Sequence, residues 1–433
     1  MKVKIRTSLP LLALLLMLSL FHLNARAAAA GGSGGWKQKN DGKWYYYDSS
    51  GKAVSGWRTI GKKTYYFDPS DGNAMTTGFK VIRTDGKACR YYFMDQNYLA
   101  FSSGSEGKLM TGFKTVKVDG TDRIFYFADS RYPAMPTGAM LTGFKTISGK
   151  RYYFADSRYP AMPLGTRLYG WKTVSGKKYY FADYRYPERK EKGSIVTGFA
   201  LIRNKVYHFT KTGVLESNWA AKNVIVIDPG HSSQIPDKEV PIGPGSKTMK
   251  DADSYGTKGI ATGVQEYELN LTMSLKLRDA LKKKGYKVVM VRTTNKGVYS
   301  CVDRAKKANK YKAAVFLRIH ANAAPKDHAK TGAMTICITP QNPFVPSTYK
   351  KSRLLSDIML GSYVKATGCF NEGVMETDTM IANNWCNYPT TLIELGYMTN
   401  TEEDKLMQTA DYQKKMLAGL VNGIDEYFKK TAD

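Results

Sequence analysis

The sequence is poor in cysteine, in acidic residues and in long apolar runs, and each shortage narrows what the chain can do. Its 433 residues include 5 cysteines without any Cys-x-x-Cys spacing, so a thiolate zinc site has no support. The odd number leaves at least one thiol free or paired between chains, and we expect most cysteines to be small buried residues. Acidic residues number 37 against 65 lysines and arginines, and the formal charge of +28 implies an anionic partner.

The long apolar run of the chain lies at its amino terminus. Basic residues precede an apolar stretch over 9–21, and Ala25-Arg26-Ala27 fits an A-x-A cleavage site. These features predict a secretory signal peptide over residues 1–27, with an uncleaved anchor as the alternative. No later stretch is apolar enough to cross a bilayer. We therefore expect an exported protein without an integral membrane span, whose anionic partner is a cell-wall polymer rather than nucleic acid.

After a small-residue linker at 28–34, the chain repeats itself through residue 219. Each unit opens with glycine and an aromatic residue, at Gly35-Trp36, Gly56-Trp57, Gly78-Phe79, Gly112-Phe113, Gly143-Phe144, Gly170-Trp171 and Gly198-Phe199. Within residues 170–183 the opening strand meets a Ser-Gly turn and then a Tyr-Tyr-Phe strand, which is typical of a β-hairpin. One hairpin cannot bury its own aromatic face, so residues 35–219 are predicted to stack as a β-hairpin solenoid.

The Gly-Trp/Phe, Gly-Lys, Tyr-Tyr-Phe and Thr-Gly signatures of this array resemble the cell-wall-binding repeats of choline-binding surface proteins, glucan-binding proteins and large clostridial toxins. The resemblance implies binding of choline in aromatic cages, or binding of sugars. The candidate wall-binding residues are Trp36, Trp44, Trp57, Trp171 and Tyr180. Phenylalanine is a poorer partner for a cation than tryptophan, so choline is expected mainly near the first three. Carbohydrate or teichoic acid is the broader expectation, and most repeat aromatics also fit a purely hydrophobic role between hairpins.

From residue 223 the aromatic repeat ceases, and strand-like and helix-like segments alternate. Residues 223–231 read Asn-Val-Ile-Val-Ile-Asp-Pro-Gly-His, a buried strand that stops abruptly. Residues 266–284 place Leu269, Met273, Leu277 and Leu281 at helical spacing. Further strands are expected near 288–291, 313–319, 334–338 and 391–395, and further helices near 302–310, 351–366 and 411–428. The alternation predicts a three-layer α/β domain over residues 223–430.

Four polar side chains are expected at one edge of this sheet. His231 follows the first strand, Glu266 opens the first long helix, and His320 ends the strand at 313–319. Two imidazoles and one carboxylate leave an open position on zinc, the arrangement of a catalytic site. Glu394 lies within an apolar strand, where acid–base catalysis beside a metal ion would explain a retained carboxylate. Each of these residues taken singly also fits a structural role.

These motifs resemble the zinc-dependent N-acetylmuramoyl-L-alanine amidases that carry an Asp-Pro-Gly-His motif. The matching segments are residues 227–231, Glu266 with Asn270-Leu271, residues 316–322 and residues 393–400. The resemblance implies one zinc ion held by His231, Glu266 and His320, with Glu394 as the catalytic carboxylate. Glu268 is the competing ligand, and Glu266 is preferred because its spacing to Asn270-Leu271 fits and because Glu268 lies on another side of the helix.

Two further residues are candidates for substrate contact. Arg318 stands where many members of that family have a small residue, and strand alternation puts it on the same face as His320. It could contact substrate or a developing oxyanion, or equally pair with a carboxylate for structural reasons. Asn384 lies in a short polar segment shortly before Glu394. The loop at 232–265, rich in glycine, proline and serine, could shape a glycan groove or act as a lid.

The sequence as a whole predicts a secreted, cell-wall-associated bacterial peptidoglycan hydrolase. We expect it to cleave the amide between N-acetylmuramic acid and L-alanine with zinc as cofactor, while the repeats hold it on the wall. A zinc peptidase or carboxypeptidase acting on stem peptides is one alternative. A non-catalytic adhesin that only binds the wall is the other.

Overall fold

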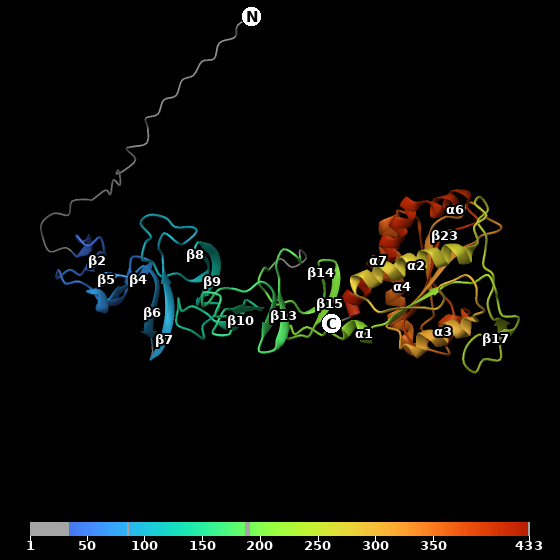
Figure 1. The fold of residues 1–433 in the computed structure, drawn as a ribbon, viewed down its shortest axis with the longest axis horizontal. Helices are drawn as coiled ribbons and strands as arrows, with labels where there is room; N and C mark the ends of the chain where they lie inside the picture. Colours follow the sequence, from blue (N-terminus) through green and yellow to red (C-terminus); the bar gives the residue numbers. More distant parts are fainter. Residues whose placement is uncertain (1–33, 85, 187–190, 432–433) are drawn as a thin grey trace, which may run out of the picture. The chain divides into compact units, whose positions relative to one another are not determined.

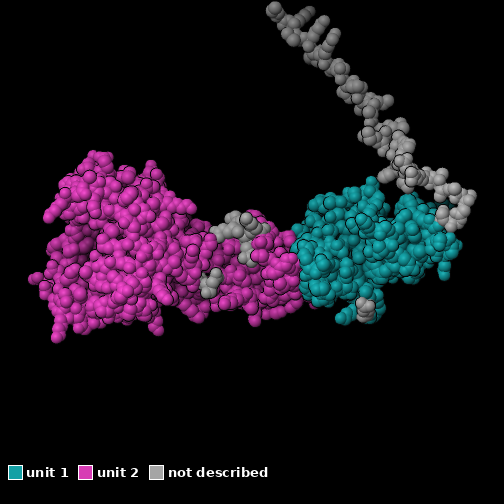
Figure 2. Space-filling view, turned by 180° about the vertical axis from the view of Figure 1, so that it is seen from behind, with its two compact units in different colours: residues 1–141 teal, residues 142–433 magenta. Residues whose placement is uncertain are grey.

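The computed structural model describes residues 34–84, 86–186 and 191–431, which form two compact units divided between Leu141 and Thr142 (Figures 1 and 2). The expected signal peptide lies outside the described residues. Within them, no helix has the length and apolar character needed to cross a bilayer. The division falls inside the predicted repeat array, because the last three hairpins belong to the same unit as the carboxy-terminal half.

The amino-terminal half is a succession of antiparallel hairpins (Figure 1). Their strands are β1 (Gly35–Gln38) with β2 (Trp44–Tyr47), β3 (Gly56–Ile60) with β4 (Lys63–Asp68) and β5 (Ala74–Met75), β6 (Gly78–Thr84) with β7 (Lys87–Phe93), β8 (Gly112–Val118) with β9 (Thr121–Phe127), β10 (Gly143–Ile147) with β11 (Lys150–Phe154), β12 (Gly170–Val174) with β13 (Lys177–Phe181), and β14 (Gly198–Ile202) with β15 (Lys205–Phe209). Every hairpin starts at the glycine of a Gly-aromatic pair, which confirms the repeat boundaries. In β12–β13 the turn is Ser175-Gly176, whose φ values of 48° and 74° suit a tight hairpin turn.

Aromatic side chains fill the space between neighbouring hairpins. Trp171 faces Tyr180 across its own hairpin, with ring centroids 5.0 Å apart, and also contacts Tyr207 and Phe209 of the next hairpin at 4.9 and 5.8 Å. The same pattern recurs at Trp36, whose ring lies 5.0 Å from Tyr65. Within each unit, these hairpins thus bury an aromatic face against the next hairpin.

The carboxy-terminal half is built on a six-stranded mixed sheet of order β19-β16-β20-β23-β21-β22. Its strands are β16 (Ile225–Pro229), β19 (Val288–Met290), β20 (Val315–Asn322), β21 (Ala333–Cys337), β22 (Asn371–Glu376) and β23 (Thr390–Tyr397). All neighbours are parallel except β21 and β23. A small separate ribbon joins β17 (Glu239–Pro241) to β18 (Met249–Asp251).

Helices pack on both faces of this sheet. Helices α2 (Glu266–Lys284), α4 (Tyr349–Thr367) and α7 (Ala410–Thr431) share one apolar core with the sheet, while α3 (Cys301–Lys310) and α5 (Ile381–Trp385) share another (Figure 1). The alternating strand residues of β16 divide between them, because Ile225 and Ile227 enter the first core and Val226 enters the second. Two further helices are α1 (Trp219–Lys222) and α6 (Thr401–Gln408).

The structure corrects the sequence-based boundaries at the strand near residues 313–319. This strand, β20, continues to Asn322, so His320 lies inside the strand rather than after it. Six described strands and α-helices of the carboxy-terminal half were not predicted, namely α1, β17, β18, β22, α5 and α6. Strand β22 contains Gly373 and few β-branched residues, and α5 has only one turn, so neither carries a clear periodic signal.

The last hairpin packs directly on the helices of the carboxy-terminal half. Trp219 of α1 lies between the hairpin and α7, with its ring centroid 5.8 Å from that of Phe199 and 5.1 Å from that of Phe428. It also stacks on His208 at 5.4 Å with an interplanar angle of 11°. Trp219 and Phe428 therefore bury aromatic surface of the last hairpin against α7.

Candidate active site

Three side chains from distant parts of the sequence meet at the carboxyl end of β16. His231 follows this strand with a positive φ of 58°, Glu266 is the first residue of α2, and His320 lies in β20. Nε2 of His231 lies 3.2 Å from Nδ1 of His320 and 3.3 Å from Oε1 of Glu266. The third side of the triangle, from Nδ1 of His320 to Oε1 of Glu266, is also 3.2 Å.

This nearly equilateral triangle fits a zinc ion. Zinc binds nitrogen and carboxylate oxygen at about 2.0–2.1 Å, so two ligand atoms of a tetrahedral site lie about 3.3–3.4 Å apart. The three observed separations are close to that value. Within the described residues, this is also the one group of histidine, cysteine and carboxylate side chains whose ligand atoms converge as a metal site requires. His231, Glu266 and His320 can therefore hold one ion and leave a fourth position open.

Hydrogen bonds from the backbone fix the orientation of these side chains. Nδ1 of His231 lies 2.8 Å from the carbonyl oxygen of Ser254, so a proton on Nδ1 leaves Nε2 free to bind metal. Glu266 accepts bonds from the backbone N–H groups of Thr257 and Ala321, at 3.0 and 3.2 Å. Asn270, one helical turn further along α2, donates to the same carboxylate at 3.1 Å.

Two glycines make room for the cluster. A β-carbon on Gly230 would lie 2.2 Å from the ring of His320, and one on Gly256 would lie 2.5 Å from Oε2 of Glu266. Gly256 also adopts a φ of +79°, which favours glycine. Any larger residue at either position would push a candidate ligand aside.

The protein holds the carboxylate ionised and one imidazole neutral. Burial would raise the pKa of Glu266, but the two histidines outweigh it and keep the pKa well below its usual value. Burial lowers the pKa of His320 to about 4. Burial also opposes protonation of His231, yet the carboxylates of Glu266 and Asp253 raise its pKa to about 10. A negative carboxylate beside a neutral imidazole is the donor set that a divalent cation prefers.

Glu394 lies beside His320 on the neighbouring strand. The two residues are paired in the register of β20 and β23, so their side chains share one face of the sheet. Its Oε2 atom is buried without a hydrogen-bond partner among the described residues. Burial and the charge of Glu266 raise the pKa of Glu394 to about 8. This carboxyl can therefore exchange a proton near neutral pH.

Comparison with known proteins identifies both halves of the chain. Residues 225–426 match a family described as N-acetylmuramoyl-L-alanine amidase, residues 34–79 match a choline-binding repeat, and residues 142–157 and 170–183 match a putative cell-wall-binding repeat. The carboxy-terminal half is an N-acetylmuramoyl-L-alanine amidase domain. The amino-terminal half carries cell-wall-binding repeats.

Two curated relatives agree with the amidase match. The chain is 28% identical to an N-acetylmuramoyl-L-alanine amidase of Mycobacterium tuberculosis over 210 residues, which are 46% of this chain and 84% of that protein. It is 25% identical to the amidase LytC of Bacillus subtilis over 236 residues, 54% of this chain and 41% of that protein. Among solved structures it is similar to the amidase Ami1 of Mycobacterium smegmatis, with 22% identity, a TM-score of 0.44, and coverage of 48% of this chain and 97% of that one.

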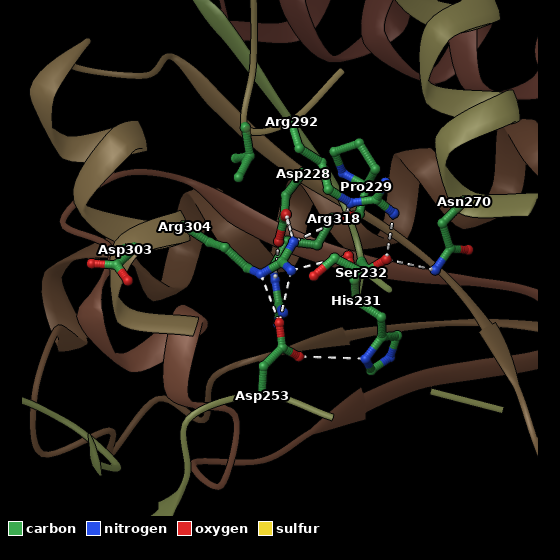
Figure 3. A network of polar contacts seen from close by, with 12 residues as sticks. Asp228, Pro229, His231, Ser232, Asp253, Asn270, Arg292, Asp303, Arg304 and Arg318 are labelled. Atoms are coloured by element: carbon green, nitrogen blue, oxygen red, sulfur yellow. Dashed lines mark hydrogen bonds and ion pairs between the residues drawn. The ribbon is translucent and has the colours of Figure 1, made fainter. Parts of the chain in front are cut away.

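A buried network of charged side chains lies next to His231 in the amidase domain (Figure 3). Arg304 of α3 donates to Asp228 at 2.6 Å and to Asp253 at 2.7 Å. It also donates to the carbonyl oxygens of Pro229 and His231, at 2.9 and 3.0 Å. Because Arg304 is fully buried, this one guanidinium holds together the strand end and the loop on either side of His231.

The structure gives Arg318 and Asn384 structural partners within the amidase domain. Nε of Arg318 donates to Asp228 at 3.1 Å, so the carboxylate pairing considered for this residue is present. Asn384 is fully buried, accepts a bond from Asn342 and donates to the carbonyl oxygens of Ile242 and Asp378. A substrate contact through Asn384 would require these bonds to break, which argues against that prediction.

Glu268, the competing ligand, points away from the group formed by His231, Glu266 and His320. Its carboxylate accepts the backbone N–H of Gln265 at 3.1 Å in a capping box, and its side chain is exposed. The geometry therefore favours Glu266. Sequence reasoning missed Asp253, Ser254 and Arg304, because none of them belongs to a motif that marks a site.

The predicted wall-binding residues fall into two groups. Trp36 is 37% exposed, and Trp44, Trp57 and Trp171 are partly exposed, so part of each ring is accessible to solvent. Tyr180 is fully buried and its hydroxyl donates to Asp183. The burial of Tyr180 argues against a ligand contact and favours a role in packing between hairpins.

Proposed function

We propose that this protein is a secreted zinc amidase that cleaves the bond between N-acetylmuramic acid and L-alanine while its repeats bind the wall. The observation that carries the proposal is the triangle of ligand atoms from His231, Glu266 and His320, with sides of 3.2, 3.2 and 3.3 Å. Bound zinc would polarise the scissile carbonyl and lower the pKa of a water. The family of the domain and its relatives support the choice of amide.

Glu394 supplies the proton transfers. Its carboxylate takes a proton as the amide carbon is attacked, and its carboxylic acid returns this proton to the leaving nitrogen of L-alanine. The raised pKa of about 8 suits both steps, because a group with a pKa near the working pH can accept and donate. Arg304 and Asp253 act through His231, which they hold in position.

The repeat array would keep the enzyme on its substrate by tethering. The array is proposed to form a continuous solenoid, and the amidase domain to form a three-layer α/β fold. Basic charge would add attraction to anionic wall polymers, and salt would screen it. Export is inferred from the amino-terminal sequence.

The test is to change Glu394 without disturbing the metal. Glu394→Gln should retain zinc and wall binding, while hydrolysis of purified peptidoglycan falls by about 10²–10⁴-fold. Glu268→Gln is the matched control, because it makes the same chemical change on an exposed residue of α2 and should leave activity unchanged. Unreduced hydrolysis by Glu394→Gln would remove Glu394 from the mechanism.

Two measurements separate the alternatives. Mass analysis of the digest should reveal intact stem peptides with new L-alanine amino termini, whereas a peptidase would release shortened peptides. Metal analysis should find one zinc per chain in the wild type and none in His231→Ala. A metal-free, inactive wild type would leave only a wall-binding adhesin.

A further inference from the structure

One position in the hairpins varies in a way that bears on what the array binds. In β12–β13, Trp171 is paired with Tyr180, and Lys178 lies two residues before that tyrosine on the same face. Side chains at such diagonal positions are close enough to touch. The equivalent residues in the other hairpins follow from their registers: Trp44 in β2, Thr64 in β4, Arg90 in β7, Ile124 in β9, Arg151 in β11 and Val206 in β15.

In three hairpins the residue at this position is a cation that lies over an aromatic ring. The guanidinium of Arg90 is 4.5 Å from the ring centroid of Phe79, and that of Arg151 is 4.2 Å from Phe144. Nζ of Lys178 is 4.8 Å from the ring of Trp171. All three distances are within the range of about 6 Å in which a cation is attracted to a ring face.

Four described hairpins have an uncharged residue at this position, and of these only the first two open with Gly-Trp. The diagonal residues of these two are Trp44 and Thr64, and in the described part of the chain no lysine or arginine lies over the ring of Trp36 or Trp57. These hairpins form the segment that matches the choline-binding repeat. An aromatic face can bind a ligand cation only where no lysine or arginine of the protein already covers that face.

A quaternary ammonium would be excluded from the covered rings. The ring face already carries a positive group, and a second cation there would meet both steric overlap and like charge. The same cations favour the binding of an anionic ligand at these hairpins. A guanidinium or ammonium held on a ring is a fixed positive charge that loses little conformational freedom when it binds a phosphate.

These three cations also lack carboxylate partners. Within the described residues, no ion pair is formed by Arg90, Arg151 or Lys178. Other arginines of the array differ, because Arg158 and Arg185 pair with Asp156 and Asp183 two residues before them. Lys178 is exposed, and Arg90 and Arg151 are partly exposed, so their charge is available to solvent and to a ligand.

We propose that Arg90, Arg151 and Lys178 convert their hairpins from quaternary-ammonium sites into receptors for the phosphodiester backbone of an anionic wall polymer. The open faces of Trp36 and Trp57 are then the places left for choline or a sugar. This proposal rests on the wall-anchored function proposed above and adds which hairpins take which class of ligand.

The test compares two triple variants of the full chain that remove the same charge. R90A/R151A/K178A removes the three stacked cations, while K87A/K177A/K205A removes exposed lysines from the turns of three hairpins. Binding to poly(glycerol phosphate) at low salt should fall by about tenfold or more in the first variant and by less than about threefold in the second, because only the first removes direct contacts. R90K/R151K/K178R keeps the charge on the ring and should retain binding.

Choline chloride provides the second measurement. Titration monitored by tryptophan fluorescence should give a larger total response in the single variant K178A than in the wild type, because removal of the exposed Lys178 side chain uncovers Trp171 in addition to Trp36 and Trp57. Equal loss of polymer binding in both triple variants, or binding to phosphatidylglycerol vesicles but not to the polymer, would overturn the proposal. Hydrolysis of peptidoglycan stripped of phosphate polymers, measured on the same samples, reports the amidase separately.

Discussion

The repeat array and the amidase domain bury their polar groups in opposite ways. In the array, Arg131, Arg158 and Arg185 each pair with the aspartate two residues before them. In the amidase domain, Asp228, Asp253 and Arg304 come from segments up to 76 residues apart and meet in the interior. In the array, each ion pair stabilises its own hairpin, so the contributions are additive. In the amidase domain, the loss of one residue destabilises the whole buried network.

The difference has a functional reason. A wall anchor gains from many similar weak contacts, and a damaged hairpin costs it only a share of its affinity. A metal site needs three ligand atoms placed to within about 0.5 Å, which demands rigid support from behind. Arg304 provides that support by binding the carbonyl oxygen of His231 itself.

Removing the metal should produce the largest difference between the two halves, because it should affect hydrolysis but not wall binding. A chelator should lower hydrolysis by at least about 10³-fold, because both the carbonyl and the attacking water lose their activation. Retention on isolated wall should not change, since no described residue of the array belongs to the group of His231, Glu266 and His320. Addition of zinc should restore activity. Full hydrolysis in the chelated protein, confirmed metal-free by elemental analysis, would contradict the assignment.

Breaking the buried network should cost the amidase domain most of its stability. Arg304→Met removes the buried guanidinium that Asp228 and Asp253 share and leaves Asp228 only Arg318 and Asp253 only His231, and loss of one partner of a buried ion pair typically costs about 3–5 kcal/mol. Hydrogen exchange should detect this opening in the amidase domain. Arg158→Met, the control in the array, removes an exposed pair and should barely change exchange there.

The amidase domain should also depend on the junction with the last hairpin. Trp219→Ala removes a ring that contacts Phe199 on one side and Phe428 on the other, and we expect a loss of about 3 kcal/mol. Trp57→Ala removes a ring in the first unit and should leave the amidase domain unaffected. Thermal unfolding followed through zinc release would distinguish these results. An unchanged amidase transition in Trp219→Ala would mean that the domain is independent of the array.

The sequence allowed different degrees of prediction for the hairpin array and for the amidase domain. The start of each hairpin was predicted because every unit repeats the same local signals, such as Gly170-Trp171, whereas the strand ends differ by up to two residues, since β13 begins at Lys177 rather than Tyr179. His231 and Glu266 could be placed because each follows a visible element boundary. His320 was expected after its strand, but β20 runs on to Asn322, since the pairing with β23 extends the strand beyond its apolar core.

The supporting residues could not be predicted, and the reason is physical. Asp253 lies in a loop without periodicity, and Arg304 resembles any charged residue on a surface helix. Only the pairing of segments 51 residues apart shows that both are buried. Tyr180 was predicted to contact a ligand, but its side chain is fully buried. The sequence of a binding repeat does not distinguish an exposed aromatic residue from a buried one.

The smallest expected effect comes from two glycines with the same backbone conformation. Gly149 has a φ of +73° and Gly256 a φ of +79°, so alanine at either position should cost about 1 kcal/mol in backbone strain. Nothing lies within 4 Å of a β-carbon on Gly149, whereas one on Gly256 would lie 2.5 Å from Oε2 of Glu266. Gly149→Ala should therefore change stability alone, while Gly256→Ala should in addition weaken zinc binding. Equal zinc affinity in the two variants would show that the loop moves freely and that Gly256 has no part in placing the ligands.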